Sequence, residues 1–260
     1  MTKIVDYNSP PLEEVVFGIS FDRVKNFPVA SYGKYWSTIA DRFPKTADRS
    51  PLISDDSDFS LDQPLIRTWF VSDNEQKLIQ LQQDRFIFNW RRVNSDWRTY
   101  PEYQNIFPEF WELFADFSRF VEQEPLKTKL AISQLELTYV NTVPFDSVSS
   151  HVNHLSEILV DHCYRNDRER FLARPTDFNW VSIYPMESGL GELKISATTA
   201  YRADNPKDSA LRLSLTCSGS INPHESNPFR SWFDTAHDYI VRGFADATNR
   251  EIQEKIWGRK

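Results

Sequence analysis

The sequence predicts an α+β fold in which one set of strands and helices occurs twice. The order strand, helix, three strands and long helix is found once before about residue 125 and again after it. Aromatic residues recur at helical spacing in both long-helix segments, and the strand segments alternate between apolar and polar residues. This pattern predicts antiparallel-rich sheet structure with helices on one face and a pseudo-twofold relation between a first repeat, 1–125, and a second, 126–260, in one compact domain.

The first repeat is expected to contain four strands and two helices. Its strand segments, rich in β-branched and aromatic residues, are 15–21, 65–71, 77–82 and 86–91. Helices are expected at 34–42 and 101–122. In the longer helix the residues on one face are Phe107, Phe110, Phe114, Phe117 and Val121. The acidic stretch 44–64 is expected to be a surface loop, because it lacks apolar residues to bury.

The second repeat is expected to follow the same order. Its strand segments are 133–140, 178–184, 192–201 and 211–217, and its helices are 148–162 and 228–256. The last helix is predicted to begin at Asn227 and Pro228, residue types that favour the first positions of a helix. Strand alternation leaves one Ser/Thr-rich sheet face open to water or a partner. In element order this repeat resembles the saddle of TATA-binding-protein-like folds, without their basic charge.

Composition narrows the functional classes. The formal net charge is −7 and the isoelectric point is near 5.3, which disfavours general nucleic-acid binding. Only 7 glycines in 260 residues disfavour glycine-rich nucleotide loops, so no cofactor is expected. Cys163 and Cys217 form no C-x-x-C motif, which favours a reducing cytoplasm. The sequence has no apolar run of membrane-spanning length, so we expect a cytoplasmic protein without membrane contact.

Three blocks of sequence carry a resemblance to known proteins. They are the opening segment 10–17, the central hairpin 78–91 and the C-terminal segment 232–259, which begins WFDTAH and ends WGR. In these blocks the chain resembles a sporadically distributed family of uncharacterised bacterial proteins of about this length. The resemblance implies a bacterial or phage-linked accessory protein in mobile or defence-related gene neighbourhoods, and it implies no reaction.

The strongest candidate binding segment combines arginines with large aromatic rings. Arginine forks bind phosphate or carboxylate groups, and flat rings stack on bases or anchor protein interfaces. The candidate binding residues are Arg85, Arg91, Arg92, Trp97, Arg98 and Tyr100. An alternative interpretation is a hairpin whose aromatic residues, Trp90 among them, are core and whose arginines extend along its surface.

Catalytic and metal-binding candidates are weaker. Asp177, Glu192 and Lys194 match the acid and E-x-K pattern of PD-(D/E)xK nucleases, in which carboxylates hold Mg²⁺ and a lysine positions water. The competing interpretation of Glu192 and Lys194 is a solvent-exposed pair on a strand. His151 and His154 are one helical turn apart and could share a metal ion, although this spacing is also typical of ordinary polar residues.

The leading hypothesis is therefore a non-enzymatic binding or regulatory protein that acts through a protein partner. The alternatives are a Mg²⁺-dependent nuclease built on Asp177, Glu192 and Lys194, and a sensor of a small nucleotide or other anion at Arg85 to Arg98. The sequence does not determine the oligomeric state or the identity of the partner.

Overall fold

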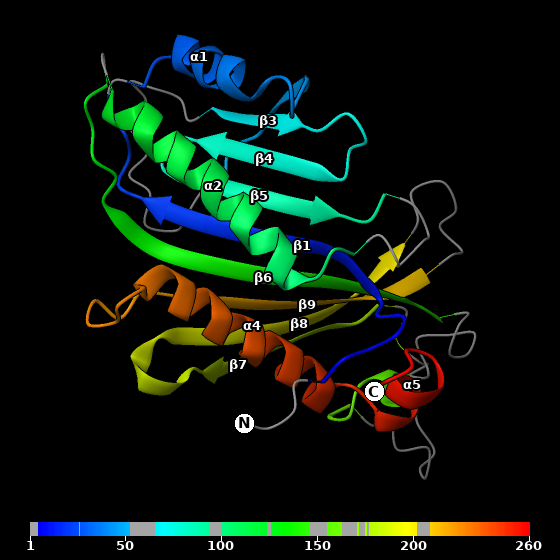
Figure 1. The fold of residues 1–260 in the computed structure, drawn as a ribbon. Coiled ribbons are helices and arrows are strands. Elements are labelled where there is room, and N and C mark those ends of the chain that lie inside the picture. Colours follow the sequence, from blue (N-terminus) through cyan, green and yellow to red (C-terminus); the bar gives the residue numbers. More distant parts are fainter. Residues whose placement is uncertain are drawn as a thin grey trace. The chain divides into compact units, whose positions relative to one another are not determined.

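The chain has an α+β fold. A computed structural model describes residues 5–25, 27–52, 66–93, 100–123, 126–145, 155–162, 171, 175, 177–201 and 209–260. The described residues form five α-helices and a nine-stranded antiparallel sheet of order β2-β3-β4-β5-β1-β6-β9-β8-β7 (Figure 1). They divide into two compact units. The first unit comprises the described residues within Val15–Ser95 and Thr99–Glu136, and the second comprises those within Met1–Glu14 and Leu137–Lys260.

The first unit contains the first five strands and the first two helices. Their bounds are β1 Leu12–Phe21, α1 Val29–Ile39, β2 Lys45–Arg49, β3 Arg67–Val71, β4 Lys77–Gln82, β5 Arg85–Arg91 and α2 Tyr103–Glu122. Strand β1 begins three residues before the unit does, in the segment assigned to the second unit. Each element that the sequence predicted here is present; β4 has the predicted bounds, and the others differ from the prediction at one or both ends.

Helix α2 crosses one face of the sheet in the first unit (Figure 1). The aromatic stripe predicted for this helix is buried, which confirms that interpretation. The ring of Phe110 stacks on Phe17 of β1 at 4.9 Å between centroids, and Phe117 lies edge-on to Tyr35 of α1 at 5.2 Å. Offset and edge-to-face aromatic pairs stabilise a core beyond the apolar area that they bury. The aromatic residues of the sequence therefore form the core beneath α2.

The second unit contains the remaining strands and helices. Their bounds are β6 Ile132–Pro144, which begins in the first unit, α3 Leu155–Ile158, β7 Asn179–Pro185, β8 Gly191–Tyr201, β9 Ser209–Gly219, α4 Pro228–Ala247 and α5 Arg250–Lys255. A short 3₁₀ turn, Glu187–Gly189, joins β7 to β8. Helix α4 crosses the face of β9 and β8 (Figure 1). The predicted start of α4 at Asn227 and Pro228 is confirmed.

Strand alternation in the second unit follows the prediction along most of its length. The predicted inward residues of β8 and β9 are buried, namely Leu193, Ile195, Ala197, Leu211, Leu213, Leu215 and Cys217. Tyr201 is an exception, because its side chain is 49% exposed at the end of β8. On the opposite face Ser196, Ser214 and Thr216 keep partial exposure. A polar face therefore lies opposite the face that α4 covers.

The predicted single helix 228–256 is wrong, because the structure has two helices there. Thr248 takes an extended backbone conformation and its hydroxyl donates to the carbonyl of Phe244 at 2.6 Å. Asn249 then caps α5 by accepting a hydrogen bond from the backbone N–H of Glu251 at 2.9 Å. Thr248 also forms a β-bridge with Leu159, so partners from outside the helix stabilise the break.

Further expectations need correction. The stretch 44–64 is not a loop throughout, because Lys45–Arg49 pairs with β3 as strand β2, while residues 53–65 lie outside the described residues. Of the predicted helix 148–162, the described part contains only α3.

The predicted duplication with TATA-binding-protein-like order is not confirmed. The helices follow the predicted one-face arrangement only loosely, and the short helices α3 and α5 contact each other. Among the described helices none is long and apolar enough to cross a membrane.

Candidate functional site

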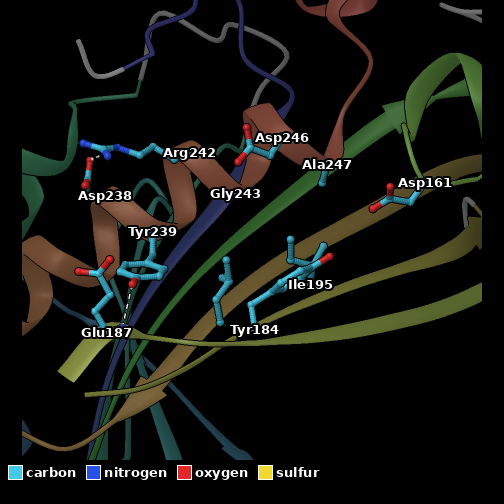
Figure 2. A pocket seen from close by; sticks show the side chains of 11 residues that line it. Asp161, Tyr184, Glu187, Ile195, Asp238, Tyr239, Arg242, Gly243, Asp246 and Ala247 are labelled. Atoms are coloured by element: carbon cyan, nitrogen blue, oxygen red, sulfur yellow. Dashed lines mark hydrogen bonds and ion pairs between the residues drawn. The ribbon is translucent and has the colours of Figure 1, made fainter. Parts of the chain in front are cut away.

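A cavity of about 520 Å³ lies in the second unit between helix α4 and strands β7 and β8. Figure 2 shows α4 above the strands, with side chains from both elements directed at the space between them. The lining residues are Asp161, Tyr184, Glu187, Leu193, Ile195, Asp238, Tyr239, Arg242, Gly243, Asp246 and Ala247. Cavities of this size with an apolar body and a few polar groups are the usual form of ligand sites in proteins.

The position of α4 on the sheet creates this cavity. The helix comes closest to β8 at Gly243, where an added Cβ would lie 2.7 Å from Cδ2 of Leu193. Strand β7 is the outermost strand described on this side of the sheet. Its Tyr184 lies opposite Leu193 on the face toward the helix and stays 41% exposed. The cavity therefore has an apolar floor of Leu193 and Ile195, bordered by the ring of Tyr184.

Carboxylates dominate the charge around the cavity. Asp238 forms an ion pair of 2.9 Å with Arg242, one turn further along α4. The other three carboxylates, of Asp161, Glu187 and Asp246, have no cationic partner within the described part of the chain. The rim therefore carries three uncompensated negative charges over an apolar floor. A cation with an apolar stem complements both features, because each part meets its matching surface.

A hydrogen bond fixes one end of the cavity. The backbone N–H of Glu187 donates to the hydroxyl of Tyr239 at 2.8 Å, which ties the β7–β8 turn to α4 (Figure 2). The hydroxyl proton of Tyr239 remains able to donate to a bound group. The exposed ring of Tyr184 can hold an ammonium or guanidinium group by cation–π attraction. Within the described residues no three His, Cys, Asp or Glu side chains are placed to hold a metal ion.

The structure describes four of the six predicted arginine–aromatic residues. Arg85 is held by the carboxylate of its neighbour Asp84, with Nε 3.1 Å from Oδ1. Arg91 donates from Nη2 to the backbone carbonyl of Glu75 at 2.9 Å. Arg92 follows β5 and is half-buried. Tyr100 lies 5.2 Å from the ring of Trp90, which is only 2% exposed. Trp97 and Arg98 lie outside the described residues, so the predicted binding segment stays a prediction.

The nuclease candidates do not converge. Glu192 is at the start of β8, opposite Pro185, and Lys194 lies two residues further along, opposite Ile183. Asp177 instead accepts a hydrogen bond of 2.8 Å from the hydroxyl of Tyr201, at the far end of β8. Nine residues of strand separate Glu192 from Tyr201, which corresponds to about 30 Å. One Mg²⁺ ion cannot bridge carboxylates at the two ends of this strand.

The predicted metal-binding histidines, His151 and His154, lie outside the described residues. His237 is half-buried at the edge of the core of the second unit, where burial lowers its pKa to about 4. Burial also raises the pKa of the Cys217 thiol to about 12. Neither group is therefore charged at neutral pH, and neither lines the cavity.

The sequence reasoning missed every lining residue of the cavity. One signal was present, because Asp238, Arg242 and Asp246 recur every four residues on one side of α4, with Tyr239 and Gly243 beside them. The lining residues at the end of β7, Tyr184 and Glu187, could not be predicted in this way. They reach the cavity only because β7 pairs with β8, and local sequence does not reveal this pairing.

Comparisons with known proteins give no match, either to models of protein families or to characterised proteins. The resemblance to uncharacterised bacterial proteins therefore stays a prediction.

Proposed function

We propose that the chain is a non-enzymatic binding protein that acts through a protein partner and holds a basic segment of that partner in the cavity beside α4. The observation that carries this proposal is the cavity of about 520 Å³ with its apolar floor and three uncompensated carboxylates. A lysine or arginine side chain has the complementary form, since its methylene stem is apolar and its head is cationic.

The position of strand β7 supports a peptide as the occupant. Among the described strands β7 is the last on its side of the sheet, so one row of its backbone groups faces away from β8. An extended segment that pairs with such an edge directs alternate side chains toward each face of the sheet. Side chains on the helix face would then reach Tyr184 and the carboxylates. Main-chain pairing would supply affinity, and the cavity would supply selectivity for basic residues.

The test is a binding measurement with defined peptides. A fluorescein-labelled peptide of alternating lysine and threonine is titrated with the protein by fluorescence anisotropy, beside a peptide of alternating glutamate and threonine. We expect saturable binding of the lysine peptide alone. An exposed ion pair contributes up to about 1 kcal/mol, so Glu187→Gln or Asp246→Asn should each weaken binding up to about fivefold. The triple variant with Asp161→Asn should abolish it.

The matched control is Glu122→Gln, which removes the same charge from an exposed residue at the end of α2 in the first unit. It should bind the lysine peptide as tightly as the unmodified protein. If the control weakens binding as much as Glu187→Gln, general charge attraction explains the binding and the cavity is not the site. Equal binding of both peptides would also refute the proposal.

We further propose that the two units derive from duplication of one ancestral unit. The strand order β3-β4-β5-β1 of the first unit corresponds to β7-β8-β9-β6 of the second. In each unit a long helix follows the third strand of the meander, as α2 follows β5 and α4 follows β9. Superposition of an experimental structure of each unit on the other would test this; a mismatch of strand directions would refute it.

A further inference from the structure

Two arginines face each other across strands β2 and β3 in the first unit. Arg49 and Arg67 are directly paired in the antiparallel register. Trp69 follows two residues after Arg67, on the same face of β3. The next residue along the strand, Phe70, points to the opposite face, where its ring meets Tyr35 of α1 at 6.1 Å. The arginine pair and Trp69 therefore lie on the sheet face that the helices α1 and α2 do not cover.

The indole of Trp69 holds both guanidinium groups. The Cζ atom of Arg49 lies 4.4 Å from the centre of the Trp69 ring, and that of Arg67 lies 5.8 Å from it. Guanidinium groups within about 6 Å of an indole are attracted by the electrons of its ring. One ring therefore keeps two positive charges close together.

Gln80 fixes the orientation of the Arg67 and Trp69 side chains. The Oε1 atom of Gln80 accepts hydrogen bonds from Nη1 of Arg67 at 3.1 Å and from Nε1 of Trp69 at 3.0 Å. Gln80 in turn donates from Nε2 to Oδ1 of Asn89 at 2.9 Å. The chain of amides runs across β3, β4 and β5. Its consequence is that Arg67 and Trp69 are held in place before any ligand is bound.

The positive charge of the pair is not neutralised by the described part of the chain. Neither Arg49 nor Arg67 forms an ion pair with a described carboxylate. The Nε–H group of Arg67 is buried and has no acceptor among the described residues. Burial lowers the pKa of Arg67, and the charges of Arg49 and Arg85 lower it further. Asp48 cannot compensate, because it pairs with Thr68 on the opposite face of the strands.

Such an arrangement costs stability in the free protein. Like charges directly opposite each other in a sheet repel, and a buried donor without an acceptor loses its hydrogen bond to water. An anion between the two guanidinium groups would remove both costs. A single carboxylate brings one negative charge, whereas a phosphate group brings up to two and offers three oxygens to the donors. The pair therefore matches a phosphate group better than a carboxylate.

We propose that Arg49, Arg67 and Trp69 form a binding site for a small phosphate-bearing ligand on the sheet face of the first unit that lies opposite α1 and α2. This site goes beyond the proposed partner-binding function, because it lies in the other unit and takes a ligand of opposite charge. The source of the phosphate is either a free inorganic phosphate compound or a nucleotide.

The test uses the full chain, with pyrophosphate, AMP and ADP as probes in isothermal titration calorimetry and thermal denaturation. We expect pyrophosphate to bind at one site and to raise the Tm. Arg49→Gln and Arg67→Gln should each weaken binding at least about tenfold, because each removes a charge-assisted hydrogen bond to the phosphate. Without ligand, both variants should unfold at the same temperature as the unmodified protein or a higher one, because the repulsion is gone.

The matched control is Arg212→Gln, which removes an exposed arginine from β9 in the second unit. It should keep the pyrophosphate affinity of the unmodified protein. Tighter binding of ADP than of pyrophosphate would assign the phosphate to a nucleotide, and the reverse order would assign it to a free phosphate compound. Unchanged pyrophosphate affinity in both arginine variants would overturn the proposal. So would a lower Tm of the ligand-free variants, because it would show that the arginines stabilise the fold. Both outcomes are independent of lysine-peptide binding at the cavity.

Discussion

His237 of α4 and Tyr139 of β6 are joined by a hydrogen bond of 3.0 Å between the imidazole Nδ1 and the phenolic oxygen. Burial lowers the pKa of His237 to about 4, an effect that the charges of Asp234 and Asp238 oppose and that of Arg230 supports. The imidazole is therefore neutral in the folded protein at pH 7. This bond connects the helix that covers the second unit to a strand of its sheet.

The depressed pKa of His237 predicts a pH-dependent stability. Below about pH 6.5 the unfolded chain binds a proton at this residue, whereas the folded chain does not until about pH 4. The free energy of unfolding should therefore fall as the pH drops through this window, by about 3 kcal/mol from this residue. Urea denaturation at several pH values should show a steeper loss for the unmodified protein than for His237→Gln. Parallel curves for the two proteins would contradict the assignment.

Gly243 predicts a steric limit at the closest approach of α4 to β8. A larger side chain there must displace Leu193, whose Cδ2 would lie 2.7 Å from an added Cβ. We expect Gly243→Val to lower the free energy of unfolding by about 1–3 kcal/mol, the usual effect of overpacking. Leu193→Ala should recover part of this loss when the two are combined, as a double-mutant cycle would measure. Additive losses would show that the two side chains do not compete for space.

Replacing Phe110 should show how much the aromatic core of the first unit contributes to the free energy of unfolding. Its side chain is fully buried and stacks on Phe17 at 4.9 Å. Phe110→Ala should lower the free energy of unfolding by about 3–5 kcal/mol, because it leaves a cavity under α2. The control Glu112→Ala, at an exposed position of the same helix, should change it by less than about 0.5 kcal/mol. Chemical denaturation followed by tryptophan fluorescence would measure both.

We expect the thiol of Cys217 to be unreactive in the folded protein. Its Sγ atom lies 3.5 Å from the carbonyl oxygen of Ala236 in the core, and burial raises the thiol pKa to about 12. In a Cys163→Ser variant, 5,5′-dithiobis(2-nitrobenzoate) at pH 8 should therefore react on the order of a thousandfold more slowly than with a free cysteine. Denaturant should restore rapid reaction of one thiol per chain. Rapid labelling of the native variant would contradict the burial of Cys217.

The local chemistry of the sequence determined the elements and their buried faces. The spacing of Phe110 and Phe117 places both on one side of a helix in any surroundings, and the alternation of Leu211 and Leu213 does the same for a strand. The end of α4 was misplaced because Thr248 and Asn249 leave the helix in favour of partners near Ile158. Those partners are about ninety residues away in the sequence, and no local preference reveals them.

Both proposed binding sites depended on tertiary structure for the same physical reason. The sequence placed Arg85 in a segment rich in arginines and aromatic residues. The ring that contacts two guanidinium groups, those of Arg49 and Arg67, is instead that of Trp69 in β3. Arg49 and Arg67 are eighteen residues apart and become neighbours only through the β2–β3 register. Likewise, Tyr184 and Gly243 border one cavity because α4 packs over β8 and β9 and β7 pairs with β8. Propensity and periodicity act between residues close in sequence, whereas the pairing of distant strands and the seating of a helix on a sheet are set by the packing of the whole chain.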